Sequence, residues 1–192
     1  KKGYIRGVQG LVITGLAADG GDSVPAATPY GIKTSPQVDV SLVVEGGPAS
    51  TLRGGDKVLA YVKDPDTVVA ANLTVRNERL DAQALKDMAG GTLKVDESDA
   101  IVGWSHPTIE AQQSPVYFGC DVYSRSFKDQ SAIEGYLKTS FGYCRARVGN
   151  FTFQDGTFTI EEIVVECFEN PSTAASVYGK EIVESLPAEL TA

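Results

Sequence analysis

The chain contains a single histidine, His106, in the segment Gly103-Trp104-Ser105-His106-Pro107. A histidine that acts as a general base in nucleophilic catalysis needs a nucleophile and an orienting acid beside it. The 192 residues contain no Gly-x-Ser-x-Gly motif, which would present a serine nucleophile at a strand-to-helix turn. We therefore interpret His106 as a loop histidine at a surface or an interface, and we predict that the protein is not an enzyme.

Other residue types that bind ions or phosphates are present without the necessary spacing. The acidic run at 96–99 offers oxygen ligands for calcium, but the spacing and glycine of an EF-hand are absent. The Gly-Gly-Asp segments at 20–22 and 54–56 lack the Lys-Ser/Thr that follows a phosphate-binding loop. We expect a solvated acidic loop, no metal and no cofactor. A pair of carboxylates for glycoside hydrolysis stays open, because its distance is set in space.

The three cysteines are Cys120, Cys144 and Cys167, each within an apolar or alternating segment. An odd number fits poorly with a disulfide framework, and no Cys-x-x-Cys or Cys/His pair offers a zinc site. We predict buried thiols in a protein core.

Seventeen basic and twenty-five acidic residues give the chain a net charge of −8. Because nucleic-acid binding works through basic surfaces, this balance argues against tight binding of DNA or RNA. It fits a surface that nucleic acid passes without retention, and it fits equally a general contribution to solubility. No apolar run approaches the ~18–20 residues of a membrane span, so we expect no membrane insertion.

The sequence pattern predicts a mostly β protein. Period-2 alternation and β-branched content predict strands at 8–16, 38–44, 57–63, 67–75, 115–125, 135–147, 151–153 and 157–168. A hairpin is expected between 57–63 and 67–75 around the turn 64–66, and a bulge at Glu161-Glu162. One short helix is expected at 81–89, capped by Asp81, with Ala84, Leu85 and Met88 on one stripe and Gly90-Gly91 at its end.

These elements predict one domain, 1–192, with a β-sandwich or barrel and a short flanking helix. Residues 19–34 are rich in glycine, proline and small residues, which predicts a long loop, and 171–192 read as an acidic C-terminal arm. An alternative is a peptide-binding module, because the glycine turns of 43–62 resemble the middle of a PDZ domain. The carboxylate-binding loop and groove helix of that domain are missing. A carbohydrate-binding β module is a further alternative.

Two segments carry a more specific resemblance. In 66–93, a β-branched strand precedes an acidic, leucine-containing helix and the turn Gly90-Gly91-Thr92-Leu93. In 136–171, the run Tyr136 to Phe141 and a basic segment with Cys144 precede Phe151-Thr152-Phe153-Gln154-Asp155-Gly156 and a strand ending at Glu169-Asn170-Pro171. Both segments, about a third of the chain, resemble the tail tube proteins of long-tailed bacteriophages (siphophage type), which are related to the type VI secretion tube subunit.

The resemblance implies a structural subunit of the phage tail that self-assembles into stacked hexameric rings. Each subunit would add four strands to an inner barrel, whose lumen conducts double-stranded DNA into the host without specific binding. With the net charge, an acidic lumen wall is expected. The implied partners are further copies of the chain and the tape-measure, tail-tip and tail-terminator proteins. The implied location is the virion tail, after assembly in the bacterial host cytoplasm.

Stacked rings need protruding elements, and we expect three: 19–34, 46–56 and 171–192. Basic residues on the strands, Lys138 among them, could pair with the acidic tail of a neighbour or form a solvated face. The residues expected at contacts between subunits or rings are Asp19, Gly20, Gly21, Asp22, Val24, Pro25, Tyr30, Arg53, Arg125, Lys128, Arg145, Arg147, Glu181, Glu184 and Glu189.

Overall fold

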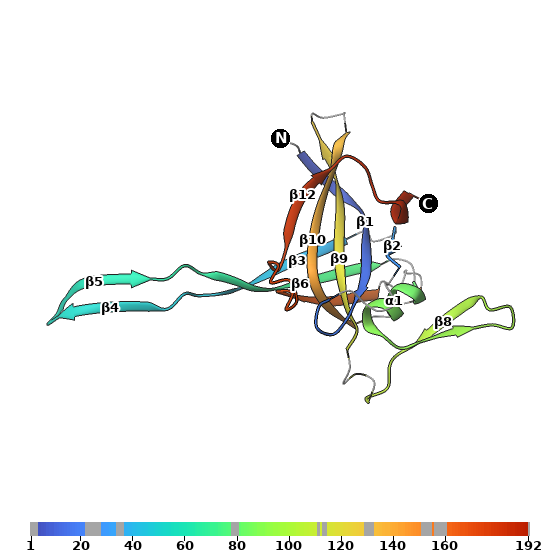
Figure 1. The fold of residues 1–192 in the computed structure, drawn as a ribbon, viewed down its shortest axis with the longest axis horizontal. Coiled ribbons are helices and arrows are strands. Elements are labelled where there is room, and N and C mark those ends of the chain that lie inside the picture. Colours follow the sequence, from blue (N-terminus) through green and yellow to red (C-terminus); the bar gives the residue numbers. More distant parts are fainter. Residues whose placement is uncertain are drawn as a thin grey trace.

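The structure is a computed structural model, and it describes residues 4–21, 28–33, 37–77, 81–110, 112, 115–128, 133–150, 155 and 161–191. Within these ranges the chain is mostly β, with short helices, as predicted (Figure 1). The elements are β1 Tyr4–Leu16, β2 Tyr30–Ile32, β3 Gln37–Glu45, β4 Ala49–Gly54, β5 Lys57–Lys63, β6 Thr67–Asn77, α1 Ala82–Ala89, β7 Thr92–Val95, β8 Ile101–Ser105, β9 Tyr117–Phe127, β10 Ile133–Val148, β11 Glu161–Phe168, β12 Gly179–Val183 and α2 Ala188–Thr191.

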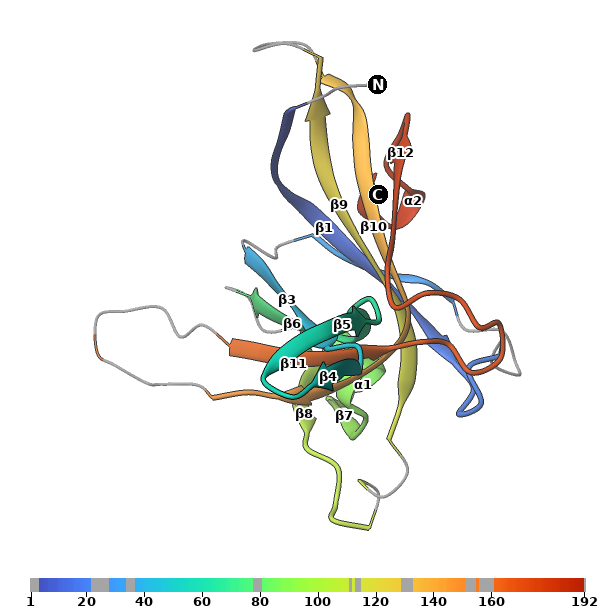
Figure 2. The same cartoon turned by 90° about the vertical axis from the view of Figure 1, so that its left-hand side faces the viewer.

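The longest strand, β10, joins two parts of one antiparallel sheet. Between Ile133 and Cys144 it pairs with β9, with a register shift after Phe141, and its segment Tyr136–Ser140 also pairs with β12. From Cys144 to Val148 it pairs with β11. The first sheet half is therefore β2-β1-β9-β10-β12, and the second is β10-β11-β6-β3. Figures 1 and 2 show β1, β9 and β10 running steeply while β11 crosses them, so the sheet folds over on itself.

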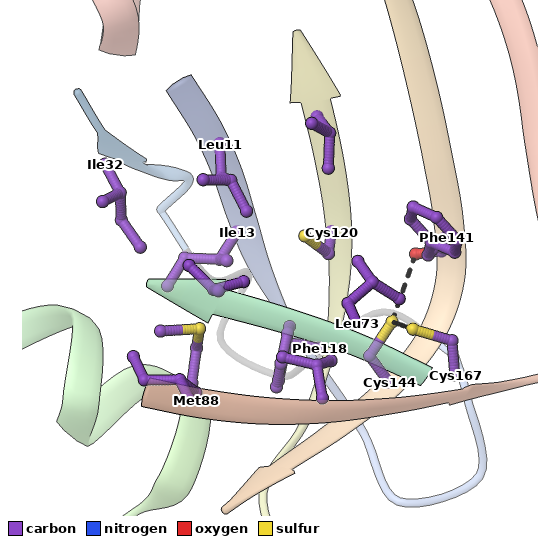
Figure 3. Close-up of a cluster of buried hydrophobic side chains, with 14 of the residues drawn as sticks. Leu11, Ile13, Ile32, Leu73, Met88, Phe118, Cys120, Phe141, Cys144 and Cys167 are labelled. Atoms are coloured by element: carbon purple, nitrogen blue, oxygen red, sulfur yellow. Dashed lines mark hydrogen bonds between the residues drawn. The ribbon is translucent and has the colours of Figure 1, made fainter. Parts of the chain in front are cut away.

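The hydrophobic core lies between the two sheet halves (Figure 3). Phe118 and Phe141 are its largest buried side chains. All three cysteines are buried and free, which confirms the prediction of core thiols. The Cys144 thiol donates to Phe141 O at 3.7 Å and lies 3.0 Å from the Cys167 sulfur. Burial raises the pKa of the Cys120 and Cys144 thiols, because a thiolate would lose its hydration there.

Helix α1 begins and ends as the sequence predicts. The Asp81 carboxylate accepts a hydrogen bond from Ala84 N at 3.0 Å, and Gly90 ends the helix with a φ of 75°. Ala84, Leu85 and Met88 are buried in the core. Neither described helix is long and apolar enough to span a membrane.

The predicted hairpin between 57–63 and 67–75 is wrong. Strand β5 pairs with β4 across the turn at Gly55-Asp56, whereas β6 pairs with β3 and β11. The segment 64–66 lies opposite 46–48 instead: Asp64 N donates to Pro48 O, and Gly47 N donates to the Asp66 carboxylate. Strands β3 and β4 on one side and β5 and β6 on the other thus form one long hairpin, which is interrupted at the same level on both sides. Pro48 and Pro65 lie at this level, and neither has an N–H to continue the ladder.

The predicted bulge at 161–162 is also wrong, because β11 and β6 pair without a register shift from Glu161 to Phe168. Glu162 and Glu166 lie on the outer side of the strand, while Ile163 and Val165 are buried. The ordinary alternation of a strand therefore accounts for Glu162 and Glu166. Of the turn predicted around 154–156, only Asp155 belongs to the described residues.

The C-terminal segment packs on its own chain, which corrects its expected role as an arm. Strand β12 pairs with β10, and Leu190 of α2 is buried with Val12 and Tyr123. Gly31 of β2 lies directly under α2, where a Cβ atom would collide with the backbone of Glu189. The segment covers part of the outer side of the first sheet half, which leaves it unavailable as a free acidic tail.

Candidate assembly surfaces

The most prominent feature outside the core is a two-stranded arm, which comprises β4, β5 and their turn, residues 49–63. It projects far from the rest of the chain (Figure 1). Glu45 and Gly54 are separated by roughly 30 Å if the strand rises at ~3.3 Å per residue. Strands β4 and β5 pair with each other and with no other described strand. The PDZ-like alternative is therefore contradicted, because Gly54-Gly55 belongs to the turn of this arm and Gly46-Gly47 lies at its base against residues 64–66, and neither forms a peptide groove.

The arm carries apolar side chains that contact little else in this chain. Its exposed large side chains, with exposed fractions of 55–64%, are Leu52, Val58, Leu59, Tyr61 and Val62. A hairpin of two strands is marginally stable at best in water. A cluster of exposed apolar side chains of this kind marks a surface that another molecule covers. The arm is thus the strongest candidate for a protein contact.

The outer side of the second sheet half is a second candidate surface, and we call it the polar face. Along each strand of this half, successive side chains point alternately to the polar face and to the core. Its side chains are exposed or half-buried, and most of them are polar: Gln37, Asp39, Ser41, Glu45, Asn72, Thr74, Arg76, Arg145, Arg147, Glu162 and Glu166, with Val43, Ala70, Val164 and Phe168 among them.

The second sheet half also has two open edges. Strand β3 ends the strand order, so its outer edge has no described partner. At the other side, β9 pairs with β10 only as far as Cys144, so residues 145–148 have no partner strand there among the described residues. Open edges expose unpaired N–H and C=O groups, which template pairing with another chain.

A groove opens where the sandwich is incomplete beside β3. It has a volume of about 330 Å³ and is lined by side chains from both sheet halves, including Val40, Leu42, Val122 and Phe141. Val40 and Leu42 are 49% and 41% exposed although they lie on the core side of β3. The core is thus left open along the same strand that offers an open edge.

A second hairpin, formed by β7 and β8, projects from the body. The sequence pattern predicted neither of these two strands. Strands β7 and β8 pair only with each other among the described strands, and Val102 is 63% exposed. The acidic run forms its turn, in which Asp96 accepts hydrogen bonds from Ser98 and Ala100. These hydrogen bonds lower the pKa of Asp96. The run is a loop with its own hydrogen bonds, as the sequence pattern favoured.

The expected contact loop begins with a turn that is fixed to the body. The Asn170 amide, which is buried, donates to Gly20 O at 3.0 Å and to Gly142 O at 3.3 Å. Gly20 has a φ of 82°, and a Cβ there would lie 2.5 Å from the Asn170 side-chain oxygen. Asp19 is exposed and accepts from Gly21 N. Asp22, Val24 and Pro25 lie outside the described residues.

The prediction of one continuous loop over 19–34 is wrong, because Tyr30–Ile32 forms β2 and pairs with β1. Tyr30 is half-buried, and its hydroxyl donates to both oxygens of Asp81 at 3.0 Å. It therefore ties β2 to the start of α1, which is a structural role within the chain.

Several expected contact residues are engaged within the chain. Lys138 lies 3.1 Å from Glu181 and 3.4 Å from Asp121, and Arg145 lies 2.8 Å from Glu166. We expected these cations to pair with the acidic tail of a neighbour, but in the structure they pair with carboxylates of their own chain. The remaining expected residues lie at the surface: Arg53 on the arm, Arg125, Lys128 and Arg147 on or beside strands, and Glu184 and the half-buried Glu189 in the C-terminal segment.

The surroundings of His106 contain no catalytic arrangement among the residues described. Its Nδ1 lies 2.9 Å from Pro107 O, and its ring packs edge-on against Trp104. Among the residues that the structure describes, the lining of a hollow of about 320 Å³ beside it includes no carboxylate, serine or cysteine. In the described part of the chain, no three His, Cys, Asp or Glu residues gather where they could hold a metal ion.

Comparisons with known proteins add little to this description. No family model and no curated protein matches the chain. Among solved structures, a chain of the cryo-EM structure of the anti-feeding prophage baseplate, 6-fold symmetrised, is 10% identical. The match covers 91% of this chain and 92% of that chain, with a TM-score of 0.33. A TM-score this low does not establish a shared fold, so the function has to be inferred from the geometry of this chain.

Tyr143 links the turn at 17–21 to the sheet and gives a prediction for pH. Its hydroxyl donates to Ala18 O at 2.7 Å, and its ring stacks on Tyr117 with centroids 4.6 Å apart. Burial, together with Tyr117, raises the pKa of Tyr143 to about 12. An unfolded tyrosine has a pKa of about 10. The stabilisation is therefore complete below pH ~10 and is lost as the pH rises from about 10 to about 12.

The free energy of unfolding, measured in urea at increasing pH, should fall across this window in the wild-type protein. Tyr143→Phe should be less stable by about 1 kcal/mol near neutral pH, because it lacks the hydrogen bond to Ala18. Its stability should also fall less steeply between pH 10 and 12. The exposed Tyr4→Phe serves as the control, and equal slopes for all three proteins would contradict the assignment.

Proposed function

We propose that this chain is a non-enzymatic structural subunit of a bacteriophage tail tube, which assembles with copies of itself into stacked rings. The observation that carries the proposal is the arm, whose exposed apolar side chains lack a partner within the described chain. A second copy of the same chain can cover the arm in every subunit, either in an isologous pair or in a head-to-tail contact. Head-to-tail contacts that close by rotation generate rings.

The second sheet half supports ring closure through the direction of its strands. Strands β10, β11, β6 and β3 are antiparallel in sequence, so β3 runs opposite to β10. When β3 of one copy pairs with residues 145–148 of the next, the new pair is antiparallel as well. The same step can be repeated around the ring without changing the hydrogen-bonding pattern, because each subunit contributes an even number of strands.

Six copies would contribute twenty-four strands to one inner barrel. At ~4.8 Å between strands and a tilt of ~40°, the backbone barrel is roughly 50 Å across. Side chains on both walls reduce the open lumen to roughly 40 Å. Since the core lies on one side of the second sheet half, the polar face becomes the wall of this lumen. That conduit is wide enough for double-stranded DNA, and the tape-measure, tail-tip and terminator proteins would be its partners in the virion.

The experiment that tests the proposal is negative-stain electron microscopy of the purified chain over a range of protein concentrations. We expect rings or hollow tubes of uniform width, because each subunit supplies both halves of the head-to-tail contact. A protein that stays monomeric at all concentrations, also when seeded with a tail-tip complex, would contradict the proposal.

A further inference from the structure

The polar face carries its charged side chains in register across neighbouring strands. Arg145 of β10 lies opposite Glu166 of β11, and Glu162 of β11 lies opposite Arg76 of β6. Arg76 in turn lies opposite Gln37 of β3. The pairing of cations with carboxylates is therefore built into the strand register and does not depend on flexible loops.

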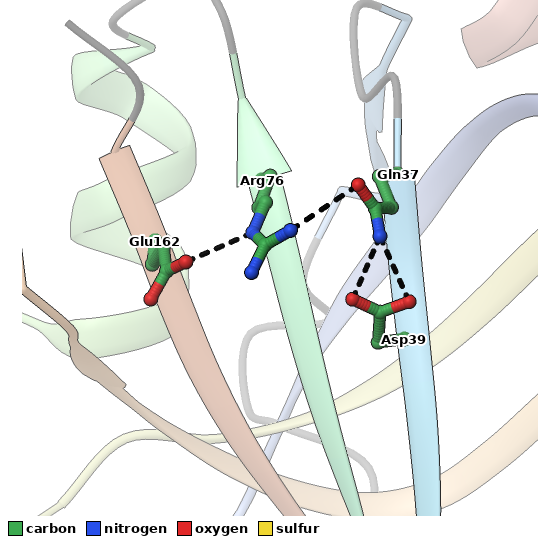
Figure 4. A network of polar contacts seen from close by, with 4 residues as sticks. All are labelled: Gln37, Asp39, Arg76 and Glu162. Carbon is green, nitrogen blue, oxygen red and sulfur yellow. Dashed lines mark hydrogen bonds and ion pairs between the residues drawn. The ribbon is translucent and has the colours of Figure 1, made fainter.

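The contacts are direct. The Arg145 guanidinium donates to a Glu166 oxygen at 2.8 and 2.9 Å, and Arg76 Nε donates to Glu162 at 2.8 Å. Arg76 Nη1 also donates to the Gln37 side-chain oxygen at 3.3 Å, and the Gln37 amide donates to both Asp39 oxygens (Figure 4). The chain of contacts extends across three strands, from β11 to β3.

The described charges of this face nearly balance. Its cations are Arg76, Arg145 and Arg147, and its anions are Asp39, Glu45, Glu162 and Glu166. The acidic wall expected from the net charge of −8 thus becomes a nearly balanced wall, if this face lines the lumen. All of its cations are arginines, whose planar guanidinium holds a carboxylate through two donors more firmly than an ammonium group does.

We propose, on the basis of the proposed function, that Glu162 and Glu166 occupy Arg76 and Arg145 of the polar face so that double-stranded DNA can slide through the lumen without being retained. Free arginines would bind phosphates and release counterions, and each such contact would slow the duplex. The charge of an arginine that is held by a glutamate at 2.8 Å is already balanced, so that arginine attracts a phosphate less strongly than a free one does. Glu162 and Glu166 are therefore the residues that keep the conduit non-adhesive.

The test uses tubes assembled in the presence of a short linear DNA duplex and then treated with nuclease. Wild-type tubes should protect little DNA. Tubes of the double variant Glu162→Gln/Glu166→Gln should protect at least about tenfold more, and the retention should decrease steeply with salt, because freed arginines bind phosphates. The matched control is Glu97→Gln/Glu110→Gln, which changes the net charge equally in two exposed turns outside the polar face. It should protect no more DNA than the wild type.

The outcomes separate this inference from the proposed function. Wild-type tubes that retain DNA, or variant tubes that retain no more than the control, overturn the inference and leave the tube intact. DNA that binds the variant but stays open to nuclease places the face outside the lumen and also overturns it. If the double variant does not assemble, the single variant Glu166→Gln decides, with an intermediate gain expected. A wild-type chain without rings or tubes overturns the proposed function itself.

Discussion

Replacing Leu52 and Leu59 of the arm by aspartate should abolish assembly and leave the subunit folded. Both side chains are more than 60% exposed in the isolated chain, so the charges stay in water while the subunit is a monomer. In a ring the arm is covered by a neighbour, and an unpaired carboxylate buried there loses its hydration at a cost of several kcal/mol. Two such charges at every contact should shift the assembly equilibrium by orders of magnitude.

Light scattering after size-exclusion chromatography and negative-stain microscopy measure this effect. Ile109→Asp is the control, because Ile109 is 82% exposed and lies in a turn outside the arm. Circular dichroism and thermal unfolding should be similar for the wild type, the control and the double variant. Tubes of normal width from the double variant would show that the arm is dispensable, and the proposed ring contact would then be wrong.

Asn170→Ala should cause the second large effect, a loss of about 3 kcal/mol in the free energy of unfolding. The side chain makes four hydrogen bonds: two donated, to Gly20 O and Gly142 O, and two accepted, from Ser172 N and Thr173 N. Alanine leaves these backbone groups without a partner in a mostly buried site, which costs about 1–3 kcal/mol for a fully buried group. The turn at 17–21 and the segment after β11 would lose their common anchor.

Chemical denaturation measures this loss, with Asn72→Ala as the control. Asn72 is exposed on the polar face, so its replacement should change the stability by less than about 0.5 kcal/mol. Since the turn at 17–21 begins a predicted contact loop, Asn170→Ala should also weaken assembly. An Asn170→Ala protein as stable as the control would mean that water satisfies the freed backbone groups.

Both predictions concern features that the sequence reveals only in part. The exposed apolar residues of the arm look like those of an ordinary half-buried strand, because alternation reports which side chains share a face and not what covers that face. Asn170 precedes a proline, which marks a turn, but its partners Gly20 and Gly142 are distant in sequence. Hydrogen bonds over such separations depend on the packing of whole elements.

The sequence by itself determined the features that depend on neighbouring residues. Asp81 caps α1 because a carboxylate at that position reaches a backbone N–H three residues on, and Gly90 ends the helix because glycine adopts a positive φ at little cost. Alternation also identified most strands, the mostly β class and the burial of the three cysteines.

Only the tertiary structure decided which strands pair. The sequence misassigned the partner of β5, because the turns at 55–56 and 64–66 are both plausible and the choice depends on where β4 and β6 lie. The sequence also did not predict that β10 changes partners near Cys144, pairing with β9 before this residue and with β11 after it. This change creates the two sheet halves. The polar face, its paired arginines and the open edges all follow from that change, because strand register is set by long-range packing and not by local sequence.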